Sequence, residues 1–216
     1  MGTGLVINKR WLPILEVVAV YSAIVLYIWW LRFHAPLSWL GIVGVIVASH
    51  ILRRETPGYL GFRMKYFRRS LGEFKLPLLG LVVTLVGAGF FFETLEDVSW
   101  RRAPFSFVFY CLWGLLQQYL LNGYFTNRFL MVFRNAGGSA DAPIAAAFLF
   151  YGVHIPNWFL MVVTLAGGYF SAKAYLKHRN LFFLGLAHGT IGFLINLTMP
   201  DSITNHLYVG PRWFSG

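Results

Sequence analysis

The sequence has little charge, few acidic residues and almost no cysteine. Only 12% of its 216 residues are charged, compared with roughly 25% in an ordinary soluble domain. Its 8 Asp and Glu stand against 18 Lys and Arg, which gives a formal net charge of +10. The single cysteine, Cys111, lies in an apolar stretch, so an intrachain disulfide is excluded and we expect a small buried hydrophobe there. Because 57% of the residues are hydrophobic, the composition excludes an ordinary water-soluble domain.

Long apolar stretches fill most of the chain. Several windows of about 16 to 25 residues are nearly free of charge, which is typical of helices that cross a bilayer. The sequence therefore predicts an all-α polytopic transmembrane helix bundle, with about seven spans and one interfacial amphipathic helix. The expected spans are 12–31, 37–52, 76–92, 105–129, 142–154, 158–169 and 181–199.

The stretch 53–75 alternates basic and aromatic residues. It holds seven Lys or Arg against two Glu, a mixture that suits an amphipathic helix lying on lipid headgroups. We expect that helix near Pro57 to Glu73. Since the basic residues sit in short loops beside apolar spans, the expected partner is a bilayer with an anionic inner leaflet, and no nucleic acid.

The positions of the basic residues predict the orientation in the membrane. If Lys9 and Arg10 are cytoplasmic, alternate crossings place 53–75, Arg128 with Arg134, and 173–179 on the same side, as the positive-inside rule requires. We therefore expect an integral protein of the inner (plasma) membrane with a cytoplasmic N-terminus.

This orientation requires a turn in the middle of 142–172. Because proline removes a hydrogen-bond donor and clashes with the preceding helical turn, Pro156 predicts either a kink or the tip of a helical hairpin, and charge placement favours the hairpin. Asn157 is expected to cap the helix that follows. The chain then divides into N-terminal spans with the interfacial helix at 1–103, a helical core at 104–199 and a tail at 200–216.

The stretch 105–129 carries polar side chains deep in an apolar span, namely Gln117, Gln118 and Asn122. Polar groups at that depth are expensive in lipid, so we expect them to face protein or a site. Gln118 and Asn122 share one helix face. His154 and His188 lie roughly 13 to 20 Å from the ends of their own spans and can meet Gln118 near the middle of the bilayer. The candidate site is therefore Gln117, Gln118, His154 and His188.

The order of these residues resembles the CPBP family, also called the Abi or CAAX-protease-like family. The resemblance covers about residues 104–199 and is carried by the polar pair with Gly123, Phe150-x-x-x-His154, Gly167-Gly168, Tyr175 and His188. It implies a membrane-embedded peptidase in which Glu and His activate water, with a metal ion as cofactor.

The chain departs from the family pattern at its most important positions. Gln117 and Gln118 stand where the family has two glutamates, Asn122 where it has arginine, and Gly192 where it has Asn or Asp. Glutamine cannot act as a general base near neutral pH, and it brings no charge to a divalent ion. Two histidines are one ligand short of the three that usually hold catalytic zinc. We therefore expect no bound metal.

Three functions remain open. The first is a non-proteolytic scaffold or accessory subunit of a membrane complex, with other membrane proteins as partners. The second is an atypical CAAX-type intramembrane peptidase that uses zinc with His154 and His188. The third is a tetrapyrrole-binding or pigment-binding protein with a histidine as axial ligand. Against all three stands a simpler reading, in which these polar residues only join helices by hydrogen bonds.

The remaining polar residues have simpler expected roles. Four histidines lie at or beyond span ends, where an interfacial position is expected: His34, His50, His178 and His206. An acidic cluster and two arginines are expected to form a solvated loop: Glu93, Glu96, Asp97, Arg101 and Arg102.

Overall fold

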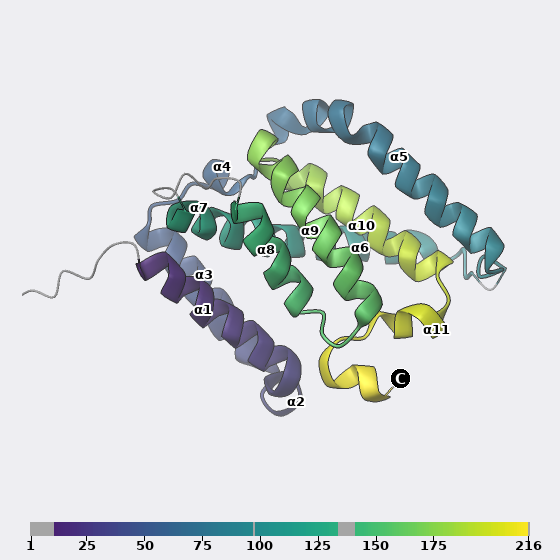
Figure 1. Ribbon diagram of the computed structural model, residues 1–216, viewed down its shortest axis with the longest axis horizontal. Coiled ribbons are helices and arrows are strands. Elements are labelled where there is room, and N and C mark those ends of the chain that lie inside the picture. The colour runs from purple at the N-terminus through teal and green to yellow at the C-terminus, as the bar shows by residue number, and fades with distance from the viewer. Residues whose placement is uncertain (1–10, 97, 134–140, 216) are drawn as a thin grey trace, which may run out of the picture.

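The computed structural model describes residues 11–96, 98–133 and 141–215. These residues form helices joined by turns, and this part of the chain contains no strand. In Figure 1 most of the longer helices run between the upper left and the lower right, so that the turns gather at two opposite ends. Four residues used to predict orientation and the acidic loop lie outside the described residues: Lys9, Arg10, Asp97 and Arg134.

The first helices form an antiparallel pair. Helix α1 (Trp11–Leu26) continues through a π-helical turn (Tyr27–Leu31) into α2 (Arg32–His34), and after a short turn α3 (Trp39–Leu52) runs back beside α1. Many large apolar side chains of this pair are exposed, including Leu26 at 51%. Such helices are apolar around most of their circumference, as expected for a surface that meets lipid.

The predicted boundary between an interfacial helix and a third span is wrong. Only α4 (Pro57–Leu60) and one 3-10 turn (Met64–Tyr66) precede α5, which runs unbroken over Phe67–Phe91 with Pro77 inside it. The basic first turns and the apolar remainder therefore form a single helix. Long Lys and Arg side chains can keep their charge in water while their stems lie along apolar surface, so the change in polarity does not require a break.

The centre of the bundle is the helical run 103–133. Helix α6 (Ala103–Gln118) passes through a π-helical segment (Tyr119–Thr126) into α7 (Asn127–Phe133). Every residue of 121–128 is buried. The prediction that Gln118 and Asn122 face protein rather than lipid is confirmed, since they are 2% and 0% exposed.

The predicted hairpin is confirmed. Helix α8 (Asp141–Gly152) and helix α9 (Trp158–His178) lie side by side on either side of a turn that contains Pro156. Asn157 caps α9, as predicted, because its side chain accepts a hydrogen bond from the backbone N–H of Leu160 at 3.1 Å.

Helix α10 (Leu181–Thr198) packs closely against α6 through glycines. A Cβ atom at Gly189 would lie 2.5 Å from the Cα of Cys111, and one at Gly185 would lie 2.7 Å from the Cα of Leu115. Small residues four apart let two helix backbones approach in this way. The close approach places His188, which lies between the two glycines, against the polar face of α6.

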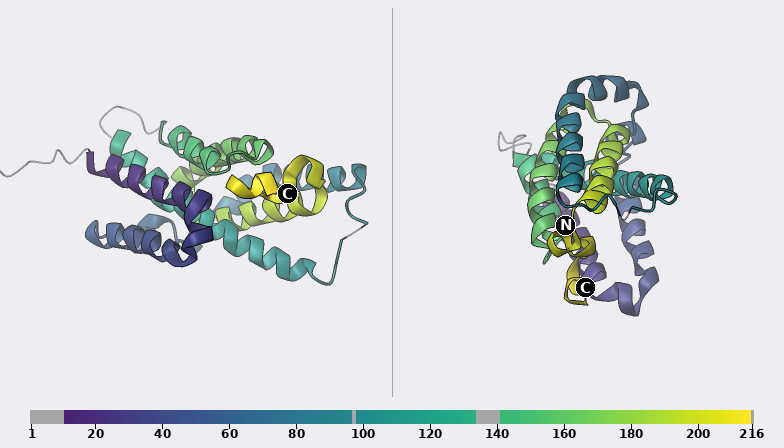
Figure 2. Two further views of the ribbon diagram at one scale, coloured as in Figure 1. Left: turned by 90° about the horizontal axis from the view of Figure 1, so that it is seen from below. Right: turned by 90° about the vertical axis from the view of Figure 1, so that its right-hand side faces the viewer.

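The C-terminal segment folds back over one end of the bundle. After α11 (Asp201–Thr204), the amide of Gly210 donates to the carbonyl of Ile155 at 2.9 Å, and Asn157 donates to the carbonyls of Thr204 and Tyr208. In Figure 2 (left), which shows the molecule from below, this segment, in yellow, is seen in front of the other helices. The segment therefore fastens the tip of the α8–α9 hairpin.

Within the residues that the structure describes, four helical segments are long and apolar enough to cross a membrane, which indicates an integral membrane protein. They are Trp11–His34, Pro57–Phe91, Trp158–His178 and Leu181–Thr198, and the shorter Pro36–Leu52 is also apolar. Among the described helices, the run 103–133 does not meet the same criteria of length and hydropathy. Its polar side chains explain this, because they are enclosed by protein and do not need to be compatible with lipid.

The α6–α10 contact can be tested by adding one methyl group. Gly189→Ala should lower the free energy of unfolding in detergent by about 1–3 kcal/mol, since the new Cβ meets backbone that cannot move aside. The control is Gly167→Ala in α9, where a Cβ meets nothing within 4 Å. It should be neutral or slightly stabilising. Equal effects of the two substitutions would show that α6 and α10 do not pack through Gly189.

Candidate functional site

The predicted polar residues at the end of α6 and just after it form a continuous chain of hydrogen bonds. The amide nitrogen of Gln118 lies 3.1 Å from Nδ1 of His188, and the amide oxygen of Gln118 accepts from Asn122 at 2.6 Å. The Asn122 oxygen lies 3.1 Å from the hydroxyl of Thr126. The chain runs along one helix face because its members are four residues apart. Both ends of the Gln118 amide are thus occupied by neutral partners.

His154 lies close to this chain but is not bonded to it. Its Nδ1 is 2.6 Å from the backbone carbonyl of Phe150. The Phe150 ring contacts both predicted histidines, with centroid distances of 4.9 Å to His154 and 5.8 Å to His188. The structure therefore brings both histidines to one aromatic ring.

The fourth predicted site residue, Gln117, is placed differently. It is half-buried on the neighbouring face of α6, and within the described residues its side chain forms no hydrogen bond. The two glutamines are consecutive, so their side chains point about 100° apart around the helix. Only Gln118 faces the histidines.

The residues present do not fit a catalytic metal. In the part of the chain that the structure describes, no group of three or more His, Cys, Asp or Glu side chains is arranged to hold a metal ion. His154 and His188 have only neutral amides beside them, and neutral amides do not offset the cost of stripping water from a divalent ion.

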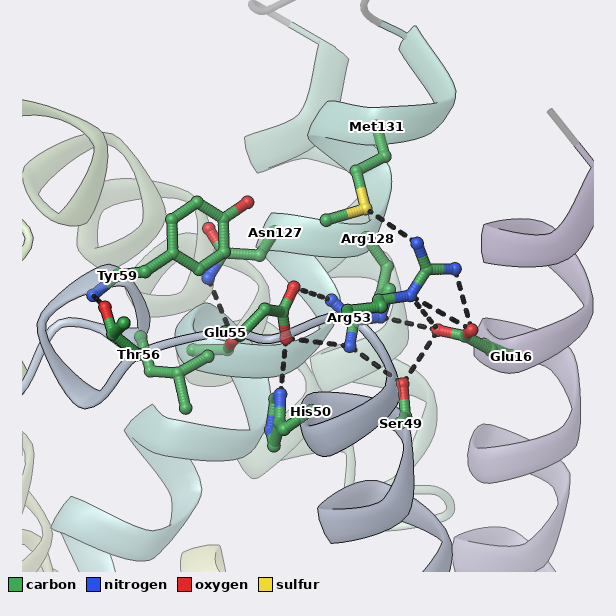
Figure 3. A network of polar contacts seen from close by, with 12 residues as sticks. Glu16, Ser49, His50, Arg53, Glu55, Thr56, Tyr59, Asn127, Arg128 and Met131 are labelled. Atoms are coloured by element: carbon green, nitrogen blue, oxygen red, sulfur yellow. Dashed lines mark hydrogen bonds and ion pairs between the residues drawn. The ribbon is translucent and has the colours of Figure 1, made fainter. Parts of the chain in front are cut away.

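A second polar cluster surrounds Arg128 in α7 (Figure 3). The side chain of Arg128 is fully buried, and it donates to Glu16 of α1 at 2.7 Å and to Glu55 of the α3–α4 turn at 2.7 and 3.0 Å. A further bond of 2.9 Å joins it to the hydroxyl of Ser49. Arg53 completes the cluster by donating to Glu16 at 2.7 Å.

His50 extends this cluster towards the polar chain of α6. Its Nδ1 lies 2.5 Å from a carboxylate oxygen of Glu55, and its Nε2 lies 2.8 Å from the hydroxyl of Tyr119. Tyr119 directly follows Gln118. The structure places His50 in the last turn of α3, at the predicted span end, and buries its side chain among ionic partners.

Glu55 is held as a carboxylate. Burial raises its pKa, but hydrogen bonds and charge from His50 and Arg128 outweigh that effect, so the pKa of Glu55 lies below its ordinary value. All four carboxylate oxygens of Glu55 and Glu16 accept hydrogen bonds from the cluster. Neither acid is free to take a proton from a substrate.

The Arg128 cluster has almost no signal in the sequence. The charge pattern predicts Arg128 as a basic residue at a span end, whereas the structure places it among the largest fully buried side chains of the described residues. Glu16, the only charge in the first predicted span, was the one available signal. A charge in an apolar helix needs a partner, but the sequence does not say which of 18 basic residues provides it.

The other predicted polar residues divide into two groups. His178 is the last residue of α9, at the predicted span end, and is buried beside Glu73 at 2.6 Å, and Lys177 also pairs with Glu73. His34 and His206 are exposed, as expected. Exposed side chains also occur in the acidic loop, at Glu93, Arg101 and Arg102.

Comparison of the chain with protein-family models, with curated proteins and with solved structures finds no match. Its function therefore has to be inferred from the two polar clusters and from the four membrane helices.

Proposed function

We propose that the protein is a non-proteolytic relative of the CPBP family that acts as a scaffold or accessory subunit in a membrane complex. The observation that supports this most directly is the saturated amide of Gln118. It stands where the family has a glutamate, and both of its polar atoms are bonded to neutral side chains. A site built this way has no acid or base with which to activate water.

The two departures from the family pattern at Gln118 and Asn122 are consistent with each other. A glutamate and an arginine four residues apart form an ion pair on a helix face, whereas Gln118 and Asn122 form a neutral amide pair at the same spacing. The neutral pair keeps the hydrogen bond and removes the charge. This favours a role in fixing helix positions over a role in proton transfer.

The nearest carboxylates do not supply the missing base. Glu16 and Glu55 are both engaged by Arg128. A carboxylate that accepts charge-assisted hydrogen bonds at every oxygen is stabilised as the anion and is a weak base. No step of peptide hydrolysis is therefore assigned to them.

One observation favours the second candidate, an atypical CAAX-type peptidase. His154 and His188 both pack against the ring of Phe150, which places the two imidazoles in the same part of the bundle. The third candidate, a tetrapyrrole-binding protein, receives no such support. Two cavities of about 750 and 600 Å³ among the described residues are lined without His154 or His188.

We further propose that the chain crosses the membrane seven times, with the N-terminus in the cytoplasm. The turns after α3 and α9 lie together at one end, since Arg179 donates to the carbonyl of Tyr59 and Asn180 to that of Arg63. The basic residues of 53–75 and 173–179 thus belong to the same end, which would face the anionic inner leaflet. Large exposed side chains, among them Phe170 at 68%, leave apolar surface for lipid or for other membrane subunits.

Labelling of single cysteines introduced after Cys111→Ala tests this topology. A cysteine at Lys177 should react with an impermeant reagent only from the cytoplasmic side, and one at Asp201 only from the outside. The reason is that α10, between them, is one of the apolar helices long enough to cross the membrane. Reaction of both positions from the same side would exclude seven crossings.

Restoring the family's acids tests the non-proteolytic assignment. Gln117→Glu with Gln118→Glu should lower the free energy of unfolding by about 1–3 kcal/mol, because the carboxylate at 118 can no longer donate to His188. We expect no cleavage of a CAAX-type peptide by this variant. Adding Asn122→Arg should recover part of the stability by pairing the new charge.

Two outcomes of that experiment would contradict the assignment to different degrees. Cleavage by the triple variant alone would show an intact protease framework that lacks only its acids. Cleavage by the natural chain, abolished by His154→Ala in protein that still folds, would overturn the scaffold proposal altogether.

A further inference from the structure

A cavity of about 750 Å³ opens beside the Arg128 cluster at the basic end of the bundle. Its lining comes from α1, the α3–α4 turn and α7, and several of these residues are labelled in Figure 3. Apolar and charged side chains alternate around it: Leu12, Glu16, Leu52, Arg53, Arg54, Glu55, Thr56, Tyr59 and Met131. The cavity plays no part in the proposed function described above.

The carboxylates that line this cavity have no free acceptor atom. Every carboxylate oxygen of Glu16 and Glu55 already accepts a bond from the cluster. By contrast, Nη1 of Arg53 contacts, among the described residues, only the sulfur of Met131, at 3.6 Å, which is a weak acceptor. A bound group that accepts hydrogen bonds would therefore satisfy the remaining donor capacity of the Arg53 guanidinium.

Arg54 adds a second cation to the same cavity. Its side chain is exposed, and it forms no ion pair with any carboxylate of the described residues. Its backbone has a φ of 54°, a left-handed conformation that residues other than glycine adopt at a cost in free energy. With Glu16 and Glu55 neutralised by Arg53 and Arg128, the charge that remains at the mouth is that of Arg54.

The rim of the cavity carries exposed apolar side chains. Leu12 and Leu52 line it and are 48% and 84% exposed, and both belong to apolar helices. Two guanidinium groups beside exposed leucines at the basic end match a phosphate joined to acyl chains. We propose that the cavity binds the headgroup of an anionic phospholipid, with the phosphate at Arg53 and Arg54 and the acyl chains along Leu12 and Leu52.

Native mass spectrometry of the full chain from neutral detergent tests the proposal. Phosphatidylglycerol should be retained as one bound lipid in preference to phosphatidylcholine. Arg54→Gln should weaken that binding about fivefold, the effect of one Arg near an anionic headgroup. The matched control is Arg68→Gln, because Arg68 is also basic and exposed but does not line the cavity. It should leave the bound lipid unchanged.

The controls separate the lipid from other sources of phosphate. Glycerol phosphate alone should compete poorly, because it has no acyl chain to lie against Leu12 and Leu52. Competition as strong as that of the lipid would overturn the lipid as occupant. Equal retention of phosphatidylglycerol and phosphatidylcholine, or equal effects of the two arginine variants in protein with unchanged melting temperature, would overturn the site itself.

Discussion

The fold depends on one buried guanidinium. Arg128 is fully enclosed, and it reaches Glu16 in α1 and Glu55 after α3 at once. Taking a charge out of water costs several kcal/mol, so such a residue is tolerated only where its partners hold it with good geometry. Three segments that are distant in sequence must therefore keep their positions together. The N-terminal pair of helices is fixed to the core by charge as well as by apolar packing.

The same constraint reaches the polar chain of α6. Gln118 and Arg128 lie at the two ends of the π-helical segment, and His50 and Tyr119 connect their surroundings by hydrogen bonds. Fixing Arg128 therefore fixes the rotation of α6, and the glycine contact with α10 brings His188 to Gln118. Segments of π-helix occur frequently at functional sites. In this protein the segment carries the buried polar residues Asn122 and Thr126 on one face.

Much of this arrangement could be predicted from the sequence, for identifiable reasons. Apolar stretches and Pro156 indicated the helices and the hairpin, and polar residues at depth indicated that Gln118, Asn122 and His188 face protein. The Arg128 cluster could not be predicted, because pairing between distant charges leaves no periodic pattern. The predicted boundary between an interfacial helix and a span at 75–76 is wrong. The residues change there from basic to apolar, but the backbone continues as one helix.

The free energy of unfolding of Arg128→Met in detergent tests most directly whether this buried ion cluster holds the fold together. Methionine keeps much of the apolar bulk and removes the charge, which leaves Glu16 and Glu55 short of a partner. The account predicts a loss of about 3–5 kcal/mol, the usual result of breaking a buried pair from one side. Arg68→Met, at an exposed position in α5, should cost far less. A loss no larger for Arg128→Met than for Arg68→Met would contradict the account.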